Sequence, residues 1–258
     1  MRHEKALTHY EALCLFSLVL LYNMFNDILS QLTVYAGTAA WMAQIIGVVL
    51  SFALLGLFLL LYRKYEGMDL PEIFDAACGK PLGRFLSIIL CVYIILYITV
   101  SLNHMVKILQ TYAFSGLSSL AVYLLVMASA AVFAVYSVNG LARVVSVFLP
   151  FILAAWLIVL LAAYRQYDPD LLNPILGYGA GYTVNAGGRL LSQFGGILIL
   201  GVFAGAFGGK REYARAALKA IAGAAVIFTV TALCYNMAVP YRSAAGLPAG
   251  VLGIAQST

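Results

Sequence analysis

The chain has 258 residues, of which 64% are hydrophobic and only 10% are charged, and its formal net charge is +5 at pH 7. An ordinary soluble domain is about 45–50% apolar and about 25% charged, so this composition excludes a water-soluble fold of this length. A lipid bilayer admits only helix bundles and closed barrels, because every backbone polar group there needs a partner within the protein. The apolar segments lack the alternation of barrel strands, so we predict an all-α integral membrane protein.

Seven apolar segments are long enough to cross a bilayer as helices, which takes about 20 residues each. The joints between them are short and carry turn-forming residues, such as Gly37 after the first segment and Asn139-Gly140 after the fourth. We therefore expect one polytopic transmembrane domain over residues 1–258. The predicted spans are 12–33, 39–62, 84–106, 117–138, 144–164, 190–208 and 216–239.

The middle of the first span is polar, with Asn23, Asn26, Asp27, Ser30 and Gln31. Asp27 alone among the ten acidic residues falls well inside a span, and ionisable groups at membrane depth are costly and point to function. Asn23, Asp27 and Ser30 lie near one another by helical spacing, so they can face the bundle interior together. The patch is therefore either a solute site or a satisfied hydrogen-bond cluster between helices.

Two further segments precede the fourth span. Residues 69–79 are predicted to form a short amphipathic helix on the cytoplasmic surface. The third span becomes more polar toward its predicted outer end, from Tyr97 through His104 to Lys107. We include Tyr97 among the ligand-binding candidates. His104 is read as structural, with proton transfer as the alternative that its near-neutral pKa allows.

Residues 165–188 are rich in glycine and only moderately polar. We expect them to fold over the outer mouth of the bundle as a lid or re-entrant turn, and the alternative is a solvated loop. The sixth span then opens with Gln193-Phe194-Gly195-Gly196 and continues through Gly201 and Gly205. Such dense glycine indicates either a small-residue packing face or a discontinuous helix whose freed backbone groups bind a solute.

Lysine and arginine residues orient the chain, because in short loops they stay on the cytoplasmic side. With the N-terminus inside, eleven basic residues fall on the inner side and four on the outer side. We therefore predict a cytoplasmic N-terminus. The four outer residues are Lys107, Arg165, Arg189 and Arg242.

No catalytic or metal-binding motif is present. The four cysteines lack metal-site spacing, and the sequence contains no HExxH, GxSxG or phosphate-binding loop. The basic residues form short clusters between apolar runs rather than one face, which argues against a nucleic-acid partner. We expect neither an enzyme nor a cofactor or metal.

Short motifs at the joints carry a family resemblance. They are Gly37 with Trp41, Gly79-Lys80-Pro81-Leu82-Gly83, Ser137 to Arg143 with Pro150, and Leu172-Asn173-Pro174-Ile175-Leu176 through Gly179. In this order they resemble the spore germination permease family. Its members are the integral-membrane B subunits of germinant receptors, related to amino acid/polyamine/organocation transporters.

This resemblance implies a leucine-transporter-like fold: two inverted five-helix repeats, a site at mid-membrane, and broken first and sixth helices. The first repeat would cover residues 1–164 and a partial second repeat 190–258, because seven spans fall short of the ten of that fold. We therefore expect the chain to be incomplete relative to the full inverted repeat. The implied ligand-binding residues are Asn23, Phe25, Asn26, Asp27, Tyr97, Gln193, Phe194, Gly195 and Gly196.

The chain also departs from the family pattern. Phe25 and Asp27 stand where the family tends to have glycines, and Asn139 and Gly196 stand where it tends to have acids. Either Asp27 replaces a backbone site with a side-chain site that favours an amine-bearing ligand, or solute binding has been lost.

The resemblance implies a membrane subunit of a spore nutrient-germinant receptor, in the bacterial cytoplasmic membrane or the spore inner membrane. Its ligand would be a small amino acid-like solute, and its partners other receptor subunits and the lipid bilayer. The alternatives are a proton- or sodium-coupled amino acid or polyamine transporter, and a membrane scaffold that binds no solute.

Overall fold

The computed structural model describes residues 8–22, 28–65, 68–135, 138–191, 196–202 and 210–241. Within these ranges all regular secondary structure is helical. The α-helices are α1 (His9–Leu21), α2 (Ile28–Ala36), α3 (Ala40–Lys64), α4 (Leu70–Cys78), α5 (Lys80–Tyr112), α6 (Ser119–Ala134), α7 (Val138–Ala162), α8 (Ala180–Arg189), α9 (Gly196–Val202) and α10 (Lys210–Ala238). The 3₁₀ helices are η2 (Gly37–Ala39), η3 (Ala163–Gln166) and η4 (Pro169–Leu172).

Four stretches of the described chain are long and apolar enough to cross a membrane: Leu29–Lys64, Lys80–Tyr112, Val138–Gln166 and Glu212–Ala238. The first of them includes a turn at Gly37, whose φ of 63° suits a residue without a side chain, so it comprises α2 and α3. Two shorter apolar helices, α1 and α6, add to these. The prediction of an all-α membrane bundle is confirmed.

The first predicted span covers two short helices, α1 and α2. The sixth contains one described helix, α9, with α8 just before it. At 1.5 Å per residue, the 13 residues of α1 extend only about 20 Å, less than the roughly 30 Å of a hydrocarbon core. Residues 23–27 and 192–195, which join these helices, lie outside the described residues.

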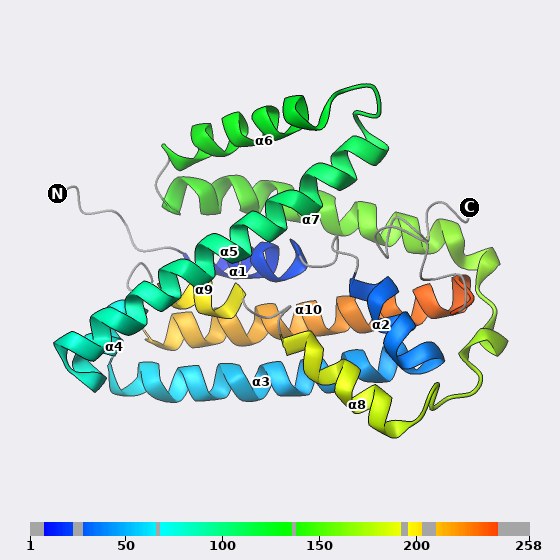
Figure 1. The fold of residues 1–258 in the computed structure, drawn as a ribbon, viewed down its shortest axis with the longest axis horizontal. Coiled ribbons are helices and arrows are strands. Elements are labelled where there is room, and N and C mark those ends of the chain that lie inside the picture. The colour runs from blue at the N-terminus through cyan, green and yellow to red at the C-terminus, as the bar shows by residue number, and fades with distance from the viewer. Residues whose placement is uncertain are drawn as a thin grey trace.

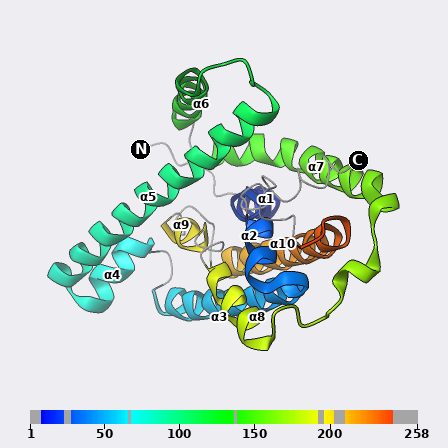
Figure 2. The same ribbon diagram turned by 45° about the vertical axis from the view of Figure 1, so that its right-hand side comes forward.

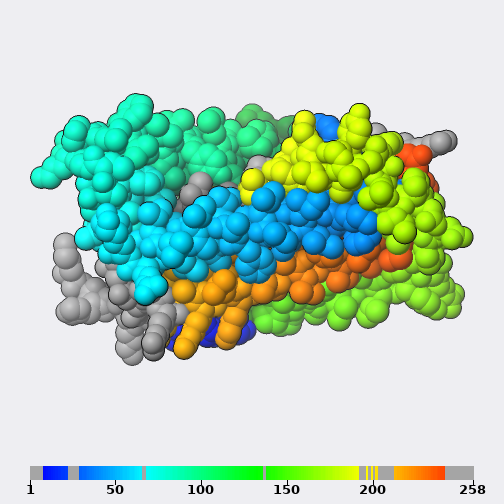
Figure 3. All heavy atoms as spheres, turned by 90° about the horizontal axis from the view of Figure 1, so that it is seen from below, coloured from blue at the N-terminus to red at the C-terminus, as the bar shows by residue number. Residues whose placement is uncertain are grey.

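Helix α1 lies in the middle of the bundle, where it contacts α7, α9 and α10 (Figures 1 and 2). Helix α3 packs beside α10, and α8 lies along the N-terminal half of α3 (Figure 3). Helix α5 crosses the bundle diagonally, and α6 packs on α5 at the periphery (Figure 1). The largest apolar cluster joins α1 to α3, α4, α5, α7 and α10, so the core centres on α1.

Helix α4 is the short amphipathic helix predicted from residues 69–79. Asp69 caps its N-terminus in a reciprocal arrangement with Glu72, and Leu70 and Ile73 are buried. The backbone then turns at Gly79, with a φ of 83°, into α5. These local features attach α4 to the start of α5.

Candidate functional site

Seven of the nine predicted ligand-binding residues lie outside the described part of the chain, and the other two lie inside it. Tyr97 is on α5, and Gly196 begins α9. The seven are Asn23, Phe25, Asn26, Asp27, Gln193, Phe194 and Gly195.

The two described candidates lie beside the last turn of α1. A Cβ added to Gly196 would come within 2.8 Å of Cγ1 of Val19, so α9 begins in close contact with α1. The hydroxyl of Tyr22, which follows α1, donates a hydrogen bond to the backbone carbonyl of Ser101, one turn beyond Tyr97 on α5. The C-terminal end of α1, in the first predicted span, therefore contacts the start of α9, in the sixth. It also contacts α5 one turn beyond Tyr97.

An aromatic cluster closes the bundle toward the N-terminal end of α10. The ring of Tyr213 lies 4.9 Å from that of Tyr62 and 5.2 Å from that of Phe16, between ring centroids, and Phe58 lies 6.0 Å away. All four side chains are buried. A Cβ on Gly201 of α9 would touch the ring of Phe58 at 2.9 Å. The aromatic rings are thus closely packed in this half of the bundle.

Buried polar residues are found mainly in the opposite half, around α2 and the C-terminal half of α10. The hydroxyl of Thr33 lies 3.1 Å from Oδ1 of Asn236, whose amide donates to the backbone carbonyl of Thr38 at 3.3 Å. The indole of Trp156 donates to the hydroxyl of Thr231 at 2.9 Å. These bonds join α2, η2, α7 and α10 through uncharged groups.

Gln44 on α3 is fully buried, and both polar atoms of its side chain lack a hydrogen-bond partner among the described residues. A buried unpaired amide costs about 1–3 kcal/mol, so such groups mark bound water, a ligand or a functional requirement. Our sequence analysis missed both Gln44 and Asn236. The signal that could have found them is a lone amide side chain within an otherwise apolar span.

Substitutions of Gln44 and Asn236 are expected to change the stability of the protein in opposite directions. Gln44→Met keeps the side-chain volume and removes an amide that has no partner among the described residues, so we expect the thermal midpoint of the ligand-free protein to stay unchanged or rise. Asn236→Leu removes a paired group and should destabilise the protein by about 1–3 kcal/mol. The thermal midpoints of both variants would be measured by unfolding the purified protein in detergent. A fall for Gln44→Met as large as that for Asn236→Leu would show that Gln44 has a partner.

A strap of residues 163–179 crosses the ends of α2 and α10. The amide of Asp168 donates to the carbonyl of Met237 at 2.9 Å, and the hydroxyl of Thr38 donates to the carbonyl of Pro174. A Cβ added to Gly37 would lie 3.4 Å from the ring of Tyr178. This packing favours the lid interpretation of residues 165–188 over a solvated loop. The last part of that segment, however, is helix α8.

Polar contacts hold the N-terminal end of α1. Thr8 and Glu11 form a reciprocal cap, with the amide of Thr8 donating to Glu11 Oε2 at 3.0 Å. Arg143 Nε of α7 donates to Glu11 Oε1 at 3.3 Å, and Lys219 of α10 lies 3.3 Å from the imidazole of His9. The hydrogen bonds from Thr8, and then Arg143, lower the pKa of Glu11 below its usual 4.5. Polar and charged side chains thus link α1 to α7 and α10.

Glu11→Gln separates the charge of this carboxylate from its capping role, because glutamine also accepts a hydrogen bond from the capping amide. A lowered carboxyl pKa stabilises the folded state above the usual pKa, and this gain is lost as the pH falls through the lowered pKa. Since Arg143 is largely exposed, we expect a loss of at most about 1 kcal/mol at pH 7. Thermal unfolding should show the difference at pH 7, and the difference should shrink progressively as the pH falls below about 4.5.

Comparison with known proteins identifies the family. A family model described as spore germination protein matches residues 11–243, nearly the whole chain. The chain belongs to the spore germination permease family. Neither the search of curated proteins nor the search of solved structures found a match. The resemblance carried by the joint motifs is therefore confirmed for this permease, and the ligand-binding residues it implies stay predictions.

The described side chains of the permease also indicate which kinds of ligand they could bind. No group of three or more histidine, cysteine or acidic side chains in the described ranges could hold a metal ion. At the end of α1 the described polar groups are the hydroxyl of Tyr22 and the carbonyl of Ser101, whereas the bonded side chains of Asn236 and Trp156 lie around α2, α7 and α10. Such groups bind and orient a polar solute through hydrogen bonds.

Proposed function

We propose that this permease is a membrane subunit of a nutrient-germinant receptor that binds a small amino acid-like solute between its first and sixth spans. The observation that carries the proposal is the meeting of Gly196, Val19 and Tyr22 at the end of α1, directly beside the segments 23–27 and 192–195. The family supplies the germination-related, permease-like function.

The local chemistry favours a ligand with an ammonium group. Helix α1 ends at Leu21, and the last carbonyls of a helix carry a partial negative charge that attracts cations. Asp27 follows six residues later and adds a full negative charge at membrane depth. Tyr97, on the facing side of α5, offers a hydroxyl and a ring. An amino acid or a related amine fits this set.

The packing around α1 supports a site reached from the strap side. The aromatic cluster around Tyr213 fills the other half of the bundle, whereas the buried polar bonds of Asn236 and the strap lie beyond the end of α1. A solute that binds more tightly to one position of the strap would shift the bundle toward that position. Partner subunits would sense this shift.

Transport of the same solute is the second candidate function, because Asp27 is a carboxylate within a span and could couple to a proton or sodium ion. A measurement of solute flux distinguishes the transport function from the receptor function. The receptor function predicts binding without net movement of a labelled amino acid into proteoliposomes, whereas the transport function predicts uptake that Asp27→Asn abolishes.

Ligand-dependent thermal stability tests the shared binding step. The purified permease would be heated with each of a panel of amino acids and polyamines. A ligand at 100 times its dissociation constant adds about 2.7 kcal/mol. We expect at least one amine-bearing compound to raise the midpoint, and Asp27→Asn to remove that rise. Ser51→Ala serves as the matched control for a buried polar substitution, because the hydroxyl of Ser51 donates within α3 to the carbonyl of Gly47. A panel without any effect on the wild type would contradict the proposal.

A further inference from the structure

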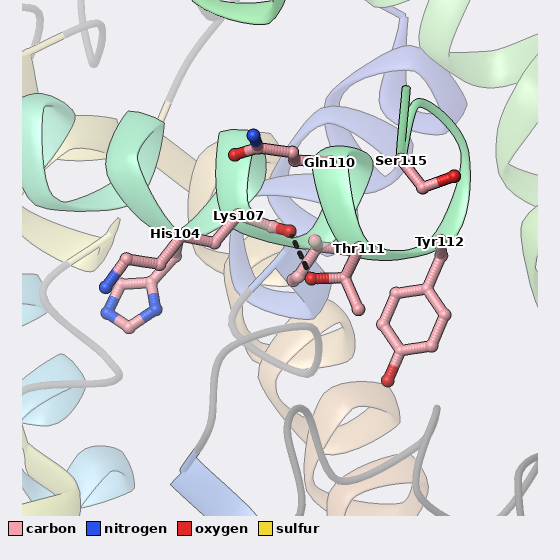
Figure 4. A pocket seen from close by; sticks show the side chains of 7 residues that line it. His104, Lys107, Gln110, Thr111, Tyr112 and Ser115 are labelled. Atoms are coloured by element: carbon pink, nitrogen blue, oxygen red, sulfur yellow. Dashed lines mark hydrogen bonds between the residues drawn. The ribbon is translucent and has the colours of Figure 1, made fainter. Parts of the chain in front are cut away.

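Several polar side chains within the spans bond to a backbone carbonyl one turn before them. The hydroxyl of Ser51 on α3 donates to the carbonyl of Gly47 at 2.6 Å. Beside the open hollow at the C-terminal end of α5, the hydroxyl of Thr111 donates to the carbonyl of Lys107 at 2.9 Å (Figure 4). Such hydroxyls are satisfied within their own helix. Gln44 differs, because neither polar atom of its side chain has a hydrogen bond in the described part of the chain.

Gln44 is fully buried where three helices meet α3. Ala43, the residue before it, shares an apolar cluster with Leu32 of α2 and with Leu190, which follows α8. Trp41, one turn before Gln44, packs against a second cluster formed by α2, α7 and α10. The amide of Gln44 is therefore enclosed by packed helices rather than exposed to lipid.

This position adjoins the proposed binding site between residues 23–27 and 192–195, which we call the central site. Helix α2 begins directly after the first of these segments, and Leu190 lies just before the second. Gly47, one turn beyond Gln44, approaches Leu190 closely: a Cβ added to Gly47 would lie 2.6 Å from Cβ of Leu190. Gln44 thus lies beside the elements that carry both segments of the central site.

Trp41 supplies a second unsatisfied polar atom. Its indole Nε1 is buried and has no hydrogen-bond partner among the described residues. Trp41 and Gln44 are three residues apart on α3, so they lie on the same side of the helix. They offer donors on Gln44 Nε2 and Trp41 Nε1, and an acceptor on Gln44 Oε1. The polar side chains bonded between the neighbouring helices, those of Thr33, Asn236 and Thr231, are uncharged.

We propose that Gln44, together with Trp41, binds the side-chain carboxamide of an amino acid held at the central site. A carboxamide lies side by side with the amide of Gln44 and satisfies both of its polar atoms with straight hydrogen bonds, while its carbonyl also accepts from Trp41. A single hydroxyl or water oxygen would have to bend both bonds to Gln44. A carboxylate would leave Gln44 Oε1 unpaired and bury a charge among uncharged groups. The inference rests on the proposed function, because the same ligand's ammonium group would lie at the end of α1.

Two isosteric pairs of amino acids test this inference. L-asparagine resembles L-leucine in shape, and L-glutamine resembles L-methionine, but only the first of each pair carries a carboxamide. Dissociation constants for the purified permease would be obtained from the rise of its thermal midpoint with ligand concentration. We expect at least one carboxamide to bind at least about tenfold more tightly than its isostere, because a site with unpaired polar groups rejects a ligand that cannot bond to them.

The variants separate recognition by Gln44 from a general effect of polar burial. Gln44→Met should reduce the preference for the carboxamide to about onefold or reverse it. Ser51→Ala is the matched control and should keep the preference of the wild type, because Ser51 is equally buried on α3 but bonds within its own helix.

Equal binding of both members of each pair by the wild type would overturn the inference, as would a preference for the carboxamide that persists in Gln44→Met. If Gln44 holds only a water molecule, Gln44→Met should change the affinities for both members of a pair by the same factor, which also contradicts the inference. The proposed function fails in a different way. A permease that no amine-bearing compound stabilises contradicts the central site and the role of Gln44 together, whereas stabilisation without a preference for carboxamides contradicts the role of Gln44 alone.

Discussion

Gly177→Ala should lower the thermal midpoint of the permease by roughly 5–10 °C, corresponding to about 2–4 kcal/mol. Gly177 has a φ of 55°, which side-chain-bearing residues adopt at a cost of about 1–2 kcal/mol. An added Cβ would also overlap the backbone carbonyl oxygen of Ala36, which cannot rotate away as a side chain can. The strap would therefore have to lift from the end of α2.

A thiol-reactive fluorescent dye can follow this unfolding in protein whose exposed Cys78 and Cys91 are replaced, because Cys14 is buried in the core around α1. Gly181→Ala is the matched control: Gly181 follows the strap in α8, and an added Cβ there meets nothing within 4 Å. We expect this control to be neutral or slightly stabilising, since alanine favours helix over glycine. A midpoint for Gly177→Ala equal to that of the control would show that the strap does not pack closely on α2.

Gly187→Ala should destabilise the permease by about 1–3 kcal/mol, because it inserts a methyl group into a filled contact. A Cβ on Gly187 of α8 would come within 2.7 Å of Cβ of Ile46 and 3.0 Å of the carbonyl oxygen of Ala43, both on α3. From the other side, Gly47 of α3 approaches Cβ of Leu190 in the same way, at 2.6 Å. The two helices thus meet through small residues, as membrane helices often do.

The neighbouring residue provides the control for this contact. An added Cβ on Gly188, also on α8, meets nothing within 4 Å, so Gly188→Ala should leave stability unchanged or increase it. Comparing the thermal midpoints of the two variants isolates the contact with α3 from the helix propensity of alanine. Equal midpoints would indicate that α8 can move away from α3 at little cost.

The sequence predicted the helices with long apolar runs, because their length and hydropathy do not depend on neighbours. The turn at Gly37 and helix α4 were also predicted, since glycine with a positive φ and a reciprocal cap are local features. Helix α8 was not. It lies in a segment rich in glycine, with low intrinsic helix propensity, and its close fit against Gly47 and Ile46 of α3 compensates for that.

The candidate site was predicted only in part, for a related reason. Asp27 was predicted as a site residue because an ionisable side chain in an apolar span is rare. Gln44 and Asn236 carry no charge, and only the fold shows that Gln44 has no partner among the described residues and that Asn236 joins α10 to η2. Likewise, the contact of Gly196 with Val19 depends on how two distant segments of the chain pack, which no local pattern encodes.

Thiol accessibility at the junctions of the first and sixth spans tests the central site most directly. Asn23→Cys, Asn26→Cys and Gln193→Cys would each be treated with a small water-soluble thiol reagent, in protein lacking the four native cysteines. If solute binds between these spans, all three should react, and the amine that stabilises the wild type should slow all three reactions. Three cysteines that fail to react in the folded protein, and react only after unfolding, would contradict a water-filled site there.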